Sequence, residues 1–404
     1  MANELSEERR PRLQNHAEFI AESAKMYRDT LVHDVVPFWQ KYAVDPESGA
    51  INNCIDDEGR LQSRDRYIWS QGRALWTFSA LCNRIEPKSE WLSVANGLYQ
   101  YLGANGRDAR GRWMYRLDAD GSVLDRDISI YVDGFVMNGF GEYYLATGDT
   151  TAAALASETF ENIRARLKAP GSYGVAPYSL GENNKTLGVP MVFSFFFYNL
   201  GKALGRPDVC EAGYACAKEV LRDFYDPEKD ALLELVTVDD ASVRTRESGY
   251  CVPGHAIEAC WFLLSIFEKT GEAELIERCC RLITRHIELG WDEEYGGIRL
   301  AVDLAGEDPP RDLDIKPWWV QVEALVATAY AYLHTRDKSF LDWHERIRKY
   351  AYSRYPTPAG EWTQWLDRYG RKTESVALPV KDPFHLPRGL MYLLELFEKR
   401  MVEA

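Results

Sequence analysis

Two of the seven histidines occupy comparable places in the chain, each near the start of an apolar, helix-like segment. His255 lies three residues before Glu258 in PGHAIEACWFLL, and His385 lies three residues before Arg388 in FHLPRGL. Residues at this spacing share a helix face, so Glu258 would fix the tautomer of His255, and Arg388 would bind a hydroxyl or a negative charge. Imidazole, with an ordinary pKa of about 6.5, exchanges protons at neutral pH. The pair predicts acid–base catalysis; the alternatives are structural histidines and a Glu258 that only satisfies a buried donor.

Two aromatic segments carry further polar groups at helical spacing. Trp69, Arg73 and Trp76 recur at i, i+4 and i+7 in RYIWSQGRALWTF, and Trp319 and Glu323 stand one turn apart in KPWWVQVEAL. A buried arginine without a partner is costly, so Arg73 needs either a structural carboxylate or a ligand oxygen. A tryptophan beside a carboxylate is a common arrangement for binding a sugar. The same tryptophans would also serve as core residues.

These residues recur with a period of about sixty positions, which is typical of stacked supersecondary units. Every second helix-like segment begins with residues suited to chemistry. The six beginnings are Trp69–Arg73, Tyr131–Asp133, Val189–Met191, His255–Glu258, Trp318–Glu323 and Pro387–Arg388. We therefore expect the candidate residues to gather at one end of one fold.

The hydrophobic pattern predicts twelve helices of two kinds. Their ranges are 17–39, 69–85, 89–106, 131–148, 151–168, 189–205, 207–225, 255–270, 273–290, 318–335, 338–355 and 387–403. Segments such as 161–168 are amphipathic, whereas 189–200 and 253–267 are apolar nearly all round and must be covered on every side. Six buried helices inside a ring of six amphipathic ones form an (α/α)6 barrel. We predict this all-α fold as a single domain over residues 1–404.

The connections leading into the apolar helices are long, and those leaving them are short. The long ones include 45–60, 117–127, 225–240, 291–303 and 361–372. Their Asp/Gly turns between apolar residues predict short β-hairpins. Long loops on one face of a repeat fold usually mark the binding face, and the partial positive charge of the helix N-termini there would favour a developing oxyanion.

The composition excludes several classes of partner. The 404 residues carry a net charge of −14, which disfavours binding to nucleic acid. The polar N-terminus lacks the apolar region of a secretory signal, and no run approaches the roughly 18 apolar residues of a membrane-spanning helix. The eight cysteines have no metal-ligand spacing, which favours buried thiols in a reducing compartment. We expect a cytoplasmic protein with no nucleic-acid or membrane partner and no cysteine-bound metal.

Several of these segments resemble the N-acylglucosamine 2-epimerase family, which includes cellobiose 2-epimerases and mannose isomerases. The matching segments, in order over residues 66–391, are RYIWSQGRALW, YVDGFVMNGFGEYYLATGD, GVPM, PGHAIEACWFLL, WWVQVEAL and FHLPRGL. The resemblance implies an (α/α)6 barrel that inverts or isomerises reducing sugars without a metal or redox cofactor. It implies that His255 and His385 are the acid–base pair. The groups that it implies for holding the open-chain sugar are Arg73, Glu258, Glu323 and Arg388, and we add Trp69 and Trp319 as substrate-binding aromatics.

One departure bears on the substrate. Cellobiose epimerases and mannose isomerases typically carry another histidine on the sixth helix, where this chain has Leu187-Gly188-Val189-Pro190-Met191. The aromatic residue that cellobiose epimerases carry before the last histidine is also absent from VKDPFH (380–385). The first feature resembles the N-acylglucosamine branch, and both features disfavour a disaccharide substrate.

We therefore predict a sugar 2-epimerase that inverts C2 of a reducing aldose through an enediolate, with N-acylglucosamine and N-acylmannosamine as the first substrate pair. The partner would be a small-molecule sugar, and a homodimer is left open. The alternatives are an aldose–ketose isomerase of the mannose/fructose type, a glycoside hydrolase using Asp133, Glu258 or Glu323, and a non-catalytic binding protein. Hydrolysis would need two carboxyl groups flanking the bond, and the two histidines would then have no role.

Overall fold

Helices make up most of the protein. A computed structural model describes residues 16–169, 171–180, 183–238, 250–304, 314–373 and 379–400. The helices are α1 (His16–Asp29), α2 (Val36–Tyr42), α3 (Ile68–Arg84), α4 (Ser89–Asn105), α5 (Ile130–Thr147), α6 (Thr150–Leu167), α7 (Gly188–Leu204), α8 (Pro207–Asp223), α9 (Pro253–Thr270), α10 (Ala273–Gly290), α11 (Trp318–Thr335), α12 (Ser339–Arg354) and α13 (His385–Leu394). Among these described helices, none combines the length and apolar character needed to cross a bilayer.

Each predicted helical segment coincides with a helix, and the ends differ by a few residues. The first segment is interrupted, because the wider turns of η1 (Thr30–Val35) separate α1 from α2. Pro37 at the start of α2 lacks the N–H of a regular helical hydrogen bond, which favours irregular winding just before it. The last segment continues from α13 into η3 (Glu395–Arg400), and residues 401–403 of that prediction lie outside the described range, as does the N-terminal stretch 1–15.

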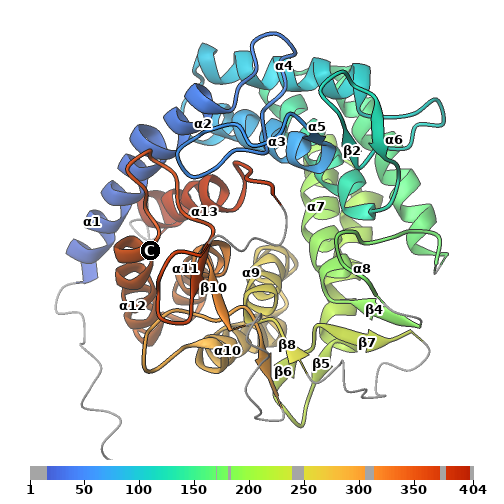
Figure 1. Cartoon of the computed structure of the whole chain (residues 1–404). Coiled ribbons are helices and arrows are strands. Elements are labelled where there is room, and N and C mark those ends of the chain that lie inside the picture. The colour runs from blue at the N-terminus through green and yellow to red at the C-terminus, as the bar shows by residue number, and fades with distance from the viewer. Residues whose placement is uncertain are drawn as a thin grey trace, which may run out of the picture.

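Six helices pack side by side in a ring around the centre of the molecule (Figure 1). They are α3, α5, α7, α9, α11 and α13; each packs on the next, and α13 packs on α3. The helices α4, α6, α8, α10 and α12 each pack on the inner helix that precedes them, and α1 packs on α13. The sequence explains the two layers. Inner α7 buries residues on all its sides, whereas outer α10 buries one stripe that includes Cys279, Ile283 and His286.

Glycine allows two inner helices to approach closely. A Cβ added at Gly139 of α5 would lie 2.6 Å from the carbonyl oxygen of Gly72 in α3, and a Cβ added at Gly72 would lie 2.8 Å from the backbone nitrogen of Val136. Any side chain at either position would force the helices apart. This contact holds the beginnings of α3 and α5, which carry candidate residues, against each other.

Short antiparallel strands connect the segments that precede the inner helices. The pairs are β1 (Arg66–Tyr67) with β2 (Arg116–Leu117), β2 with β3 (Val123–Asp125), β4 (Asn184–Thr186) with β7 (Leu235–Thr237), β5 (Tyr225–Asp226) with β6 (Ala231–Leu232), β8 (Tyr250–Cys251) with β9 (Val302–Asp303), and β10 (Ile315–Pro317) with β11 (Trp365–Asp367). Only β2–β3 and β5–β6, among the described strand pairs, lie within a single connection. The others join the segment before one inner helix to the segment before the next, so neighbouring repeat units are linked in a rim where the inner helices begin.

Candidate active site

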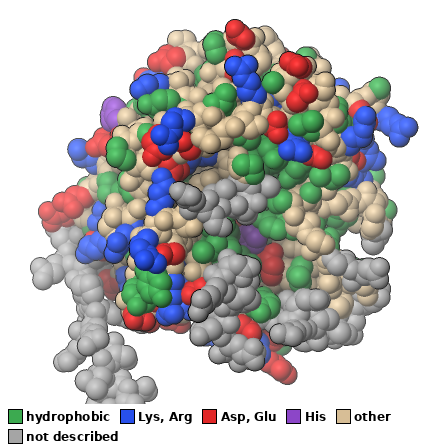
Figure 2. Space-filling view, viewed as in Figure 1, with side chains coloured by type: hydrophobic (Ala, Val, Ile, Leu, Met, Phe, Trp, Pro, Cys, Tyr) green, Lys and Arg blue, Asp and Glu red, His purple; other side chains and the backbone are tan. Residues whose placement is uncertain are grey.

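The predicted site residues lie near the N-terminal ends of four inner helices. His255 is the third residue of α9, Trp319 is the second residue of α11, and His385 is the first residue of α13. Arg73 lies in the second turn of α3. The space-filling view shows a hollow on this face, with a histidine visible in it among acidic and hydrophobic side chains (Figure 2).

His385 belongs to a buried, charged network formed by helices α9, α11 and α13. Its Nδ1 lies 2.8 Å from Oε1 of Glu323, and Oε2 of Glu323 accepts a hydrogen bond from the indole N–H of Trp261 at 2.9 Å. Nη2 of Arg388 donates to the same Oε1 of Glu323 at 2.7 Å and also to Oε1 of Glu258. We call His385, Glu323, Arg388 and Glu258 the His385 network.

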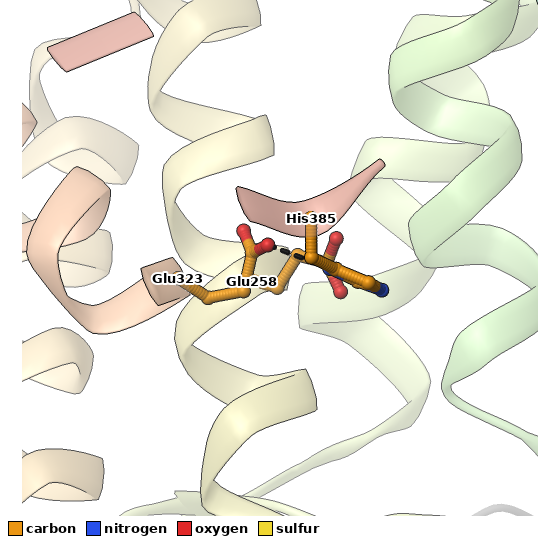
Figure 3. Close-up of side chains that lie close together, drawn as sticks. All are labelled: Glu258, Glu323 and His385. Atoms are coloured by element: carbon orange, nitrogen blue, oxygen red, sulfur yellow. Dashed lines mark hydrogen bonds and ion pairs between the residues drawn. The ribbon is translucent and has the colours of Figure 1, made fainter. Parts of the chain in front are cut away.

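Burial is the main reason that the imidazole of His385 is neutral. It lowers the pKa of His385 to about 3; the positive charges of Arg73 and Arg388 act in the same direction, and the negative charges of Glu258 and Asp382 oppose it. The carboxylate of Glu323 can only accept hydrogen bonds, so Nδ1 must carry the proton and Nε2 keeps its lone pair. Figure 3 shows this second nitrogen pointing away from Glu323. A neutral imidazole with a free Nε2 can act as a general base.

His255 contacts a carboxylate that is not bound to an arginine among the described residues. Its Nδ1 lies 2.9 Å from Oε2 of Glu234, and Oε1 of Glu234 accepts a hydrogen bond from the hydroxyl of Thr186 at 3.1 Å. Burial alone would lower the pKa of His255, but the negative charge and hydrogen bond of Glu234 outweigh burial, and the pKa is raised. We call these two residues the His255 pair. A protonated His255 can act as a general acid.

One indole contacts both imidazoles. The ring centroid of Trp319 lies 5.1 Å from that of His255 and 5.6 Å from that of His385, with interplanar angles of 30° and 38°. This packing requires a glycine on α9, because a Cβ added at Gly254 would lie 2.6 Å from the Trp319 ring. The two histidines, 130 positions apart in the chain, therefore share one site, as the sequence analysis required.

Arg73 is held by a carboxylate that the sequence analysis did not identify. Its Nη1 donates to Oδ2 of Asp382 at 3.0 Å. Its guanidinium carbon lies 4.0 Å from the ring centroid of Phe135, 4.8 Å from that of Trp69 and 4.9 Å from that of Phe384. Such contacts stabilise a cation. Because 15% of its side chain stays exposed, Arg73 can also reach a ligand oxygen.

The predicted pairing of His255 with Glu258 is wrong. Glu258 accepts a hydrogen bond from Arg388 of α13, and the carboxylate that binds His255 comes from Glu234, in the connection before α9. The i,i+3 rule states only that two side chains share a helix face, and a stronger partner on another helix can take either one. Arg388 is 1% exposed and donates to two carboxylates, which favours a role in holding Glu258 and Glu323 over direct contact with a sugar.

The carboxylates considered for hydrolysis are all bound to arginines. Asp133 accepts a hydrogen bond from Arg166 at 3.0 Å, and Arg388 donates to Glu258 and Glu323. The possible ligand atoms of Glu258, Glu323 and His385 lie within 4.8 Å of one another, close enough for a metal ion. Since a guanidinium already bridges the two carboxylates, the positive charge that a metal would supply there comes from Arg388.

Comparison with known proteins decides the family. Residues 49–387 match the model of the family described as N-acylglucosamine 2-epimerase. The chain belongs to this family.

Individual relatives agree over nearly the full length. The chain is 27% identical over 393 residues to the N-acylglucosamine 2-epimerase of Bos taurus, covering 93% of this chain and 92% of that protein. It is 32% identical over 386 residues to the cellobiose 2-epimerase of Bacteroides fragilis, covering 89% and 95%. The structure of cellobiose 2-epimerase from Spirochaeta thermophila matches the fold with a TM-score of 0.83 at 20% identity, covering 97% of this chain and 100% of that one. The protein is therefore an enzyme of the isomerase class, related to named epimerases.

Proposed function

We propose that the protein is a sugar 2-epimerase that inverts C2 of a reducing aldose by moving a proton between two histidines. The observation that carries this proposal is the pair of imidazoles against one indole, each with its own carboxylate. The pKa of His255 is raised and that of His385 is lowered. Inversion at one carbon needs a group that removes a proton and a group that returns one to the other face. A neutral His385 and a protonated His255 meet this need.

The reaction begins after the sugar ring has opened. Nε2 of His385 takes the C2 proton, and the bonding electrons move toward the C1 carbonyl to give an enolate, which is an enediolate when C2 carries a hydroxyl. This carbon is acidic because the adjacent carbonyl accepts the charge. A positioned base typically contributes about 10²- to 10⁴-fold to such a step.

The second half of the reaction returns a proton from His255 to the other face of C2. The carbonyl at C1 re-forms, His385 is left protonated and His255 neutral, and exchange with solvent or reversal restores the starting state. Arg73, which lies against Trp69 and Phe384, would stabilise the negative oxygen at C1 by its positive charge. In the reverse direction the two histidines exchange roles.

An N-acylated hexosamine is the first substrate class to test. The Bos taurus relative is named for this substrate, and the start of α7 has Leu187-Gly188-Val189-Pro190-Met191 where cellobiose epimerases and mannose isomerases typically carry another histidine. A Cβ added at Gly188 would lie 2.5 Å from the hydroxyl of Tyr131, so the tyrosine already occupies the space that a side chain there would need. We also assign the closed ring of α3, α5, α7, α9, α11 and α13 to an (α/α)6 barrel that forms one domain.

Incubation with N-acetylglucosamine or N-acetylmannosamine in D2O, followed by product NMR, tests the proposal. We expect each sugar to yield the other, with deuterium at C2. Mannose and glucose, which carry a hydroxyl at C2, test the alternative: a ketose product with deuterium at C1 would instead establish the aldose–ketose isomerase. Absence of exchange with these sugars and with mannose, glucose and cellobiose would contradict epimerisation altogether.

A further inference from the structure

The segment that follows α6 is attached to the start of α5 by backbone hydrogen bonds. The N–H of Ile130 donates to the carbonyl of Gly174 at 2.9 Å, and the N–H of Ala176 donates to the carbonyl of Ile128 at 3.2 Å. Val175, between these bonds, is buried, and a Cβ added at Gly174 would lie 2.3 Å from the Ile128 oxygen. The backbone at 174–176 is therefore held firmly against the rim.

The same connection ends beside the His255 pair. Strand β4 pairs with β7, the N–H of Leu187 donates to the carbonyl of Glu234 at 2.9 Å, and the hydroxyl of Thr186 donates to the Glu234 carboxylate. The described parts of this connection thus contact the start of α5 at one end and the carboxylate that binds His255 at the other.

Tyr178 stands on a turn within this connection and is unusually exposed. Its N–H donates to the carbonyl of Val175 at 3.1 Å, which closes the turn directly after the attached backbone. The side chain is 63% exposed, the largest fraction among the large hydrophobic side chains that the structure describes as exposed. An exposed aromatic ring contributes little to the hydrophobic core. When the backbone that carries it is fixed by hydrogen bonds, such a ring often marks a binding surface.

Charged groups of the candidate active site act on Tyr178. Partial loss of solvent raises the pKa of its phenol, the negative charge of Glu234 adds to the rise, and the positive charge of Arg73 opposes it. Its turn is held at the start of α5, and in the ring of inner helices α5 lies across from α11, which carries Trp319.

We propose that Tyr178 forms the outer wall of the sugar site, where its ring covers the bound reducing sugar opposite the Trp319 side. This inference rests on the proposed function, because it assigns a substrate-binding residue to that reaction. An aromatic ring suits this place, since its face contacts the C–H groups of a sugar while its hydroxyl stays in water. The role is affinity; Tyr178 takes no part in proton transfer.

The test compares Tyr178→Ala and Tyr178→Phe with the wild-type enzyme in both directions of the epimerisation. Loss of the ring should raise KM by roughly tenfold and leave kcat within about threefold, because the contact is made equally in the ground and transition states. Tyr178→Phe keeps the ring and should stay within about threefold of wild type in KM. Tyr369→Ala is the matched control: Tyr369 is 54% exposed and contacts Tyr295 and Arg371.

Saturation-transfer NMR with N-acetylglucosamine separates the failure of this inference from the failure of the proposed function. If wild type neither binds nor converts any reducing sugar, the proposed function is wrong. If wild type binds the sugar and Tyr178→Ala binds it equally well, the inference about Tyr178 is wrong. A fall in kcat without a change in KM, or an equal effect of Tyr369→Ala, would also overturn it, and thermal unfolding would confirm that all variants are folded.

Discussion

The His255 pair and the His385 network place the same side chain in two electrostatic settings. Glu234 of the pair accepts from His255 and from one hydroxyl, and 19% of its side chain is exposed. Glu323 of the network is fully buried and also binds Arg388 and Trp261. The charge of Glu323 is already balanced by a guanidinium. Such a carboxylate stabilises a protonated imidazole less than a carboxylate with no other cationic partner does.

Under the proposed function, this difference would prepare an acid and a base from one residue type, because separated pKa values of two titrating groups assign their roles. Burial lowers the pKa of both imidazoles, and the charge and hydrogen bond of Glu234 outweigh burial at His255. The four predictions below test this comparison by changing the histidines, their carboxylates or the hydroxyl that supports Glu234.

The largest expected effect follows removal of either imidazole. His255→Asn and His385→Asn should each lower kcat by about 10³-fold, because general acid–base catalysis by a positioned group contributes on this order. Steady-state assays with the N-acylated sugar pair would measure the loss. The exposed His33 offers a matched control, and His33→Asn should keep wild-type activity. If either active-site variant retained a tenth of the wild-type rate, that histidine would have no place in the mechanism.

Matched substitutions of the two carboxylates should separate stability from catalysis. Glu323→Gln leaves the buried Arg388 short of one charge partner, and breaking a buried pair from one side costs roughly 3 to 5 kcal/mol in the free energy of unfolding. Glu234→Gln acts on a partly exposed pair and should cost less than about 1 kcal/mol. Denaturant unfolding of both variants would measure this. Equal losses of stability would contradict the contrast between the network and the pair.

The pH dependence of kcat/KM should change on one side only. His255 must be protonated, so activity falls as the pH rises through its raised pKa; His385 must be neutral, so activity falls at low pH. Glu234→Gln removes the charge that raises the pKa of His255 while burial still lowers it. We expect the alkaline limb to move to lower pH, the acid limb to stay, and the rate near neutral pH to fall about tenfold. Movement of the acid limb instead would assign the roles the other way round.

The smallest effect should follow loss of the hydroxyl that supports Glu234. Thr186→Val keeps the shape of the side chain and removes one hydrogen bond. Such a bond contributes about 1 kcal/mol, so we expect kcat/KM to fall by less than roughly fivefold. The same assays would detect it, with the stability of the variant as the control. A loss as large as that of Glu234→Gln would mean that the hydroxyl sets the position of the carboxylate.

The helices were predictable because their signal is local. In α10, for example, the apolar residues recur every three or four positions, and this spacing alone determines which face must be buried. The sequence also indicates where each inner helix begins, because turn residues give way there to an unbroken apolar run. His255, His385 and Trp319 could therefore be assigned to one end of the fold before any tertiary contact was known.

The partners of these residues could not be predicted in the same way. Glu234 lies 21 positions from His255, Glu323 lies 62 positions from His385, and Glu258 lies 130 positions from Arg388. The sequence offered one weak signal, an apolar-flanked glutamate in the connection before α9, and gave no preference for it over Glu258 as the partner of His255. Asp382, which binds Arg73, likewise lies in the last connection, 309 positions away.

The chain by itself determined two layers of helices, a common end for the reactive residues and the residue type proposed to move the proton. Only the packing of the ring decided which carboxylate each histidine received, and so which imidazole has the raised pKa and which the lowered one. The physical reason is range: helical periodicity depends on neighbours three and four positions apart, whereas an ion pair depends on which helices meet. The proposed acid and base thus differ by their tertiary neighbours, and the histidines themselves are chemically the same.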